Sequence, residues 1–252
     1  MNFCAFLKKW DYFWFHEVDS VRLKLFQIGM GISLFIYLTS QWHWKEEWLT
    51  TVGYHLSPEL FKSFYVLPVF PLIPIAWLGM IGYFWRLSVL SLILGIGGRI
   101  SIFLCLIVIG YPTVLDPISS FTLNLLFIAS FLMLSLTKST GGLLRLHKVD
   151  MTTVMVERML QVTLITCYFF SGWKKAVVGN WLEHTDVLFT QVQGHYRTDL
   201  AAWLIGVLPP QAWFLMQLSS LVFELGAPYL FFHPKSRPWV VAYGILFHVA
   251  IV

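Results

Sequence analysis

Long apolar stretches, separated by short polar or glycine- and proline-rich segments, dominate the pattern of this chain. Several run for about 17 or more residues with little charge, the length that crosses a bilayer. The stretches predict six spans, at about 25–38, 75–96, 100–114, 121–136, 151–172 and 213–232. Every lipid-exposed backbone group must be hydrogen-bonded within its own segment, so we expect helices. The pattern predicts an all-α, polytopic integral membrane helix bundle over residues 21–252.

The first 20 residues have a different pattern, in which aromatic and charged positions alternate with helical spacing. The apolar positions are Phe3, Phe6, Leu7, Trp10, Phe13 and Trp14, and the charged ones are Lys8, Lys9, Asp11 and Glu17. An amphipathic helix rich in aromatic residues lies in the membrane interface. Residues 1–20 therefore predict an N-terminal interfacial helix.

Composition supports a membrane protein. The chain of 252 residues is 58% hydrophobic and only 12% charged, with a mean hydropathy of +0.71, whereas an ordinary soluble domain is about 25% charged. The net charge of +4 lies in short loops, so it indicates membrane topology and not a nucleic-acid surface. The lipid bilayer is the partner that the composition implies.

The loop charges predict an orientation. Basic residues gather at Arg99, in the segment 138–148 and in the turn 235–237, whereas the loop after Gln41 is slightly acidic. Basic loops stay in the cytoplasm. We therefore expect a multi-pass protein of the cell membrane with a cytoplasmic N-terminus and with Lys175 at the outer end of its helix.

The helix that ends in Lys174 and Lys175 carries the main candidate chemistry. At about 100° per residue, Lys175 shares one face with Gly172, Tyr168 and Gln161. One interpretation is that both lysines extend to the headgroups. The other is that Lys175 points inward, where a poorly solvated amine loses pKa and can accept a proton. Lys174 lies about 100° away, on an apolar side.

Three blocks of this chain resemble a known family. YFFSGWKK followed by NWLE, the turn GIGGRIS with a later Asp116, and the segment from Glu224 to the pair Phe247–His248 are similar to vitamin K-dependent gamma-carboxylases. They are also similar to their bacterial relatives, the HTTM (horizontally transferred transmembrane) proteins. The resemblance covers roughly residues 23–252, and it implies an HTTM-like transmembrane domain.

The resemblance implies a pocket at the extracytoplasmic membrane face. Lys175 would be the base that deprotonates a quinol such as vitamin K hydroquinone, or another lipid-soluble substrate, and His248 would be a second catalytic group. The substrate-binding residues would be Tyr168, Trp181, Glu224 and Arg86. Arg86 and Glu224 also stand out by themselves, because charges inside apolar spans face the bundle interior. An open alternative is that these two are structural, and pair with each other or with backbone carbonyls.

A non-catalytic function is the second interpretation. The carboxylases have a catalytic histidine at the start of the fourth span, where this chain has the segment from Phe121 to Asn124. An asparagine cannot shuttle a proton as imidazole does. The alternative is a membrane protein that assists maturation or export of a partner peptide or protein. The spacing of His184 and His195 is not a metal-ligand pattern, so we expect no metal site.

The last apolar run, from Pro238 to Val252, predicts about 22 Å of helix at 1.5 Å per residue. A hydrocarbon core is about 30 Å thick. We therefore expect the last span to be incomplete.

Overall fold

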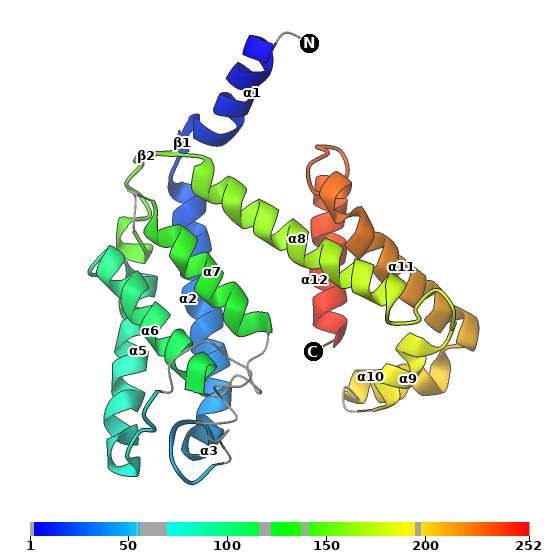
Figure 1. Cartoon of the computed structure of the whole chain (residues 1–252), viewed down its shortest axis with the longest axis horizontal. Coiled ribbons are helices and arrows are strands. Elements are labelled where there is room, and N and C mark those ends of the chain that lie inside the picture. The colour runs from blue at the N-terminus through cyan, green and yellow to red at the C-terminus, as the bar shows by residue number, and fades with distance from the viewer. Residues whose placement is uncertain are drawn as a thin grey trace. The chain divides into compact units, whose positions relative to one another are not determined.

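The structure, a computed structural model, is α-helical apart from one short pair of strands (Figure 1). It describes residues 3–53, 55, 70–115, 122–137, 141–194 and 198–251. Asp116, Phe121, His195 and Val252, which the sequence analysis considered, lie outside these residues. The chain divides into two compact units, Met1–Leu160 (unit 1) and Gln161–Val252 (unit 2), and α8 contributes residues to both.

Unit 1 is built around a bundle of four helices. In Figure 1, α2 lies beside α5 and α7, and α6 lies against both α5 and α7. The core contains large apolar side chains with almost no exposed surface, among them Leu34, Val89, Ile102 and Phe131. The elements of unit 1 are α1 (Phe3–Phe15), β1 (Glu17–Asp19), α2 (Val21–Gln41), η1 (Trp42–Trp44), α3 (Lys45–Leu49), η2 (Ile75–Trp77), α5 (Leu78–Leu94), α6 (Arg99–Leu115), α7 (Thr122–Ser135), η3 (Leu143–Arg145), β2 (Met151–Thr153) and the first part of α8 (Met155–Val177).

The glycine-rich turn after α5 has a backbone that only glycine suits. Gly95 caps α5 in the left-handed region with φ of 80°, where a Cβ atom is strained. A Cβ on Gly95 would lie 2.0 Å from the backbone nitrogen of Gly142, and one on Gly142 would lie 2.0 Å from the carbonyl oxygen of Ile93. The two glycines therefore let the segment after α7 pack directly on the end of α5.

A two-stranded antiparallel ladder joins the ends of unit 1, and the apolar pattern did not predict it. Glu17, Val18 and Asp19 pair with Thr153, Thr152 and Met151. Beside it, Lys24 of α2 is 1% exposed and donates to the carbonyl oxygens of Arg145 and Lys148 and to Asp150 Oδ2. A buried ammonium needs such partners. Lys24 thereby fixes the segment before α8 to the start of α2.

Unit 2 contains the second part of α8, α9 (Val187–Gln193), α10 (Asp199–Val207), α11 (Pro210–Leu230) and α12 (Arg237–Ile251). α9 packs on α10 and α11, and α11 packs on α12. Pro210 at the first position of α11 suits a helix start, because its missing N–H would have no helical partner there. α8 extends to Val177, so both lysines lie within the last helical turn, beyond the end that the apolar pattern predicted.

Among the described residues, two helical stretches are long and apolar enough to cross a membrane, Val21–Leu49 and Ile75–Leu94. Arg99–Leu115 and Leu123–Ser135 are apolar but shorter. α8 and α11 have sufficient length but carry polar side chains within them, such as Gln161, Gln217 and Glu224. The structure thus shows an α-helical protein with two helices of membrane-spanning length and composition, fewer than the six predicted spans.

Replacing Lys24 with Met should destabilise unit 1. The carbonyl oxygens of Arg145 and Lys148 would lose their donor, at a cost of about 1–3 kcal/mol. The measurement is thermal unfolding of the purified protein in detergent, with Lys9→Met on the exposed α1 as the control. Equal unfolding temperatures for the two variants would mean that the Lys24 contacts contribute little.

The orientation inferred from loop charges can be tested at two exposed positions. Cys4 is exposed and is first replaced by Ser. Val178 is 77% exposed and Leu144 is 59% exposed, so a cysteine fits at either place, whereas Gly142 has no room for a Cβ atom. In intact cells, an impermeant thiol reagent should label Val178→Cys and spare Leu144→Cys until the cells are opened. The reverse labelling would contradict the predicted orientation.

Candidate functional site

An ion pair between α8 and α11 forms the centre of the candidate site. Lys175 Nζ donates to Glu224 Oε1 at 2.7 Å, and the Lys175 and Glu224 side chains are 26% and 5% exposed. The ammonium also lies 4.5 Å from the centroid of the Trp181 ring, where the ring face attracts a cation. Lys174, one position earlier, is exposed. The two neighbouring lysines therefore have different environments.

The turn after α8 brings Trp181 back over the lysine. Asn180 has φ of 58°, in the left-handed region that asparagine tolerates better than most residues. The N–H of Trp181 donates to the carbonyl oxygen of Lys175 at 3.3 Å. The chain thus reverses directly beyond the helix, and the Trp181 side chain covers the ammonium.

Gly172 allows the two helices to approach closely at this point. A Cβ atom there would lie 2.8 Å from the Cβ of Glu224 and 3.0 Å from the backbone nitrogen of Leu225. The first distance is too short for a real Cβ contact, so something would have to shift, and the second is very tight. Gly172 therefore sets the short separation across which Lys175 reaches Glu224.

Gln217 holds the turn against α11. Its side chain is buried and donates from Nε2 to the carbonyl oxygens of Trp181, at 2.8 Å, and His184, at 2.7 Å. Its Oε1 atom accepts from the N–H of Leu188 at 3.0 Å. A buried amide whose donors and acceptor are all engaged keeps its neighbours in one arrangement. Gln217 is thus a positioning residue for Trp181.

Two polar atoms beside the ion pair lack a partner. Glu224 Oε2 and Ser220 Oγ are buried and make no hydrogen bond with any described residue. They lie one helical turn apart on α11, so they are on the same face. An unsatisfied buried oxygen costs roughly 1–3 kcal/mol, and a ligand that donates a hydrogen bond would remove that cost.

A second pair, Tyr168 with His248, lies in the same unit. The Tyr168 hydroxyl and His248 Nε2 are 2.7 Å apart. The Tyr168 ring stacks on Phe231 and meets Phe223 edge to face, with ring centroids 5.0 Å apart in the latter pair. Tyr168 is seven residues before Lys175, which is about 10.5 Å along a helix. Tyr168 therefore lies on the same face of α8 as Lys175, two turns away.

Arg86 belongs to unit 1 and has partners there. Its Nη1 atom donates to the carbonyl oxygen of Gly82 at 2.8 Å, and its guanidinium lies over the rings of Trp42 and Trp85. Arg86 and Glu224 thus have different partners, and the carbonyl contact is one of the structural alternatives for Arg86. Asn124, at the predicted start of the fourth span, accepts from the Tyr37 hydroxyl at 2.7 Å.

Five of the six predicted site residues lie in unit 2, and the structure adds Gln217, Ser220 and Gly172. Among the described residues, no group of three or more His, Cys, Asp and Glu side chains is placed to hold a metal ion. Gln217, Ser220 and Glu224 are spaced so that they lie on one face of a helix. This polar stripe on an otherwise apolar segment is the sequence pattern from which Gln217 and Ser220 could have been predicted.

The chain was compared with protein-family models, curated proteins and solved structures, and none of them matches it.

Proposed function

We propose that this chain is a multi-pass membrane protein of the HTTM and gamma-carboxylase-like type. Its unit 2 accepts a proton from a lipid-soluble acid, of which a quinol is the leading example. The observation that carries the proposal is the Lys175–Glu224 pair, whose second carboxylate oxygen has no partner among the described residues. An acidic hydroxyl is the ligand group that such an oxygen accepts.

The pair can act as one proton-accepting unit. In this proposal Lys175 passes a proton to Glu224 Oε1, 2.7 Å away, which leaves a neutral amine beside a carboxylic acid. The amine then takes the proton of the substrate hydroxyl. The products are an ammonium, a protonated Glu224 and the substrate anion, and the ammonium and anion attract each other. The Trp181 face, 4.5 Å away, stabilises the ammonium formed in this step.

Tyr168 and His248 can exchange a proton with each other. A hydroxyl and an imidazole nitrogen 2.7 Å apart can pass a proton, because each group both donates and accepts. In this proposal His248 carries the catalytic role that the family resemblance suggests. The face shared by Tyr168 and Lys175 supports this assignment.

A non-catalytic function is the second candidate, in which the chain assists maturation or export of a partner peptide or protein. The observation that favours it is Asn124, bound to the Tyr37 hydroxyl, at the place where the carboxylases carry a histidine. In this reading the Lys175–Glu224 pair joins α8 to α11 and does no chemistry.

Hydroquinone oxidation by O₂ separates the two candidates, because the hydroquinone anion reacts with O₂ faster than the neutral form does. The purified chain in lipid nanodiscs should accelerate O₂ consumption by a lipid-soluble hydroquinone. Lys175→Met and Glu224→Gln should each lower the rate about 10²- to 10⁴-fold, the usual contribution of a general base. Lys174→Met, the matched control, should change it less than about twofold.

The control variants decide whether Lys175 acts as a base or as an interfacial anchor. Each variant is first shown to reach the wild-type level in the membrane. Equal losses for Lys174→Met and Lys175→Met would identify an interfacial anchor. If wild type does not exceed Lys175→Met, the enzyme proposal is wrong and the non-catalytic candidate is preferred.

A further inference from the structure

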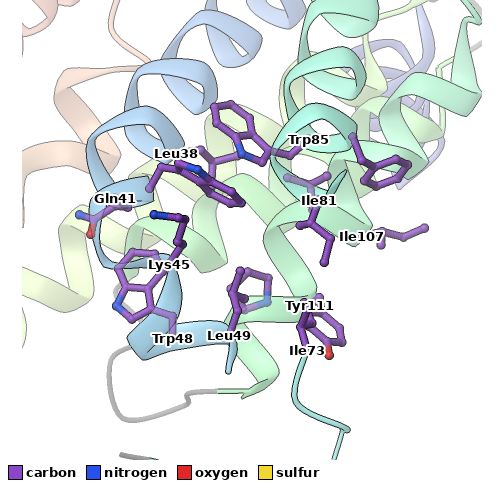
Figure 2. A pocket seen from close by; sticks show the side chains of 14 residues that line it. Leu38, Gln41, Lys45, Trp48, Leu49, Ile73, Ile81, Trp85, Ile107 and Tyr111 are labelled. Atoms are coloured by element: carbon purple, nitrogen blue, oxygen red, sulfur yellow. The ribbon is translucent and has the colours of Figure 1, made fainter. Parts of the chain in front are cut away.

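A partly open apolar cavity lies in unit 1. None of the residues that line it belongs to the site around Lys175 and Glu224. The cavity has a volume of about 230 Å³, and it is bounded by the ends of α2, α3, α5 and α6 (Figure 2). Its surface is almost entirely apolar, and Trp42, Trp85, Ile81 and Ile107 are among the residues that line it. Such a lining favours an apolar ligand.

Polar groups without partners lie at this cavity. Gln41 and Lys45 line it, and Figure 2 shows them on the side formed by α2 and α3. Neither side chain makes a hydrogen bond or an ion pair with another described residue. The indole N–H of Trp85, a residue 2% exposed, is also without an acceptor among the described residues. The Tyr111 hydroxyl, in contrast, already donates to the Pro71 carbonyl oxygen.

The unpaired groups are the ammonium of Lys45, the amide of Gln41, which both donates and accepts, and the indole N–H of Trp85. The cation among them favours an anionic acceptor. Gln41 ends α2 and Lys45 begins α3, and both residues line the cavity. A carboxylate accepts from an ammonium and an amide together, and such charge-assisted bonds are stronger than neutral ones. The ligand therefore has an anionic, hydrogen-bond-accepting head next to an apolar body.

Size and position limit the ligand further. The volume of the cavity is smaller than the roughly 300–1,000 Å³ of sites that bind drug-sized ligands. It therefore admits one acyl chain and not two. Lys45 lies near the end of Val21–Leu49, one of the two stretches of membrane-spanning length. A head group at that level meets the membrane surface while its chain stays in apolar surroundings.

We propose that the cavity binds a long-chain fatty acid. The carboxylate contacts Lys45 and Gln41, and the first part of the acyl chain lies among Trp42, Trp85, Ile81 and Ile107. This site involves none of the residues proposed to accept the quinol proton, so the two proposals stand independently.

Photolabelling tests the site in the whole protein. The probe is an alkynyl palmitate that carries a diazirine, applied to the purified chain in nanodiscs, with labelled peptides identified by mass spectrometry. The label should map to peptides around Lys45 and Ile81. Palmitate should displace it at concentrations at least about fivefold lower than hexadecanol, which has the chain without the charge.

Two substitutions with matched controls locate the ligand. Ile81→Trp fills the cavity and should abolish labelling, whereas Leu87→Trp, on the same helix but 66% exposed, should not change it. Lys45→Gln removes the charge at nearly constant length and should make palmitate and hexadecanol equal competitors. Lys9→Gln, on α1, should leave the preference for palmitate unchanged.

Several results would overturn the proposal. Equal labelling of wild type, Ile81→Trp and Leu87→Trp would show that the cavity is not the site. Equal competition by palmitate and hexadecanol in wild type would show that the cavity does not select an anionic head group. Displacement by a diacyl phosphatidylglycerol but not by palmitate would assign the cavity to membrane phospholipid. If Ile81→Trp unfolds, the palmitate preference of Lys45→Gln decides alone.

Discussion

The need to partner charge inside apolar helices shapes unit 2. Glu224 lies on a helix that is otherwise mostly apolar, and an isolated carboxylate there would be strongly unfavourable. Lys175 provides the counter-charge at 2.7 Å, which requires α8 and α11 to approach closely. Gly172 permits that approach, and Gln217 fixes the turn that places Trp181 over the ammonium. Each of these positions follows from the same ion pair.

Unit 1 handles its buried cations differently. Lys24 is surrounded by two carbonyl oxygens and a carboxylate, and Arg86 donates to a carbonyl and lies over two indoles. Both have partners from several directions, so they stabilise the fold and have little capacity for a ligand. Lys45 is half-buried and has no partner among the described residues, and it lines the apolar cavity. In each unit, the candidate binding site is the place where polar groups lack a partner, and not simply the place where a charge lies.

The sequence predicted the helices well and their contacts poorly. Apolar runs located α2, α5, α6, α7 and α11 to within a few residues, because helix length and hydropathy are local properties. The 100° periodicity also distinguished Lys175 from Lys174. The partner of Glu224 was not predictable, since Arg86 and Lys175 were both available cations and nothing local pairs α8 with α11. Lys24 resembled an ordinary charge beside a span, and the three-residue strands Glu17–Asp19 and Met151–Thr153 were too short for an alternating pattern.

Stability alone does not account for the Lys175–Glu224 pair. Removing two charges from water costs about as much as their attraction returns, so a buried pair often contributes no more than two apolar side chains of the same volume. Here the carboxylate is more deeply buried than the ammonium, and Glu224 Oε2 and Ser220 Oγ remain unsatisfied beside it. A pair that served only to join two helices would gain from having those oxygens bonded or replaced. The open acceptor Glu224 Oε2 lies next to the lysine, and this is the arrangement on which the proposed binding of an acidic hydroxyl rests.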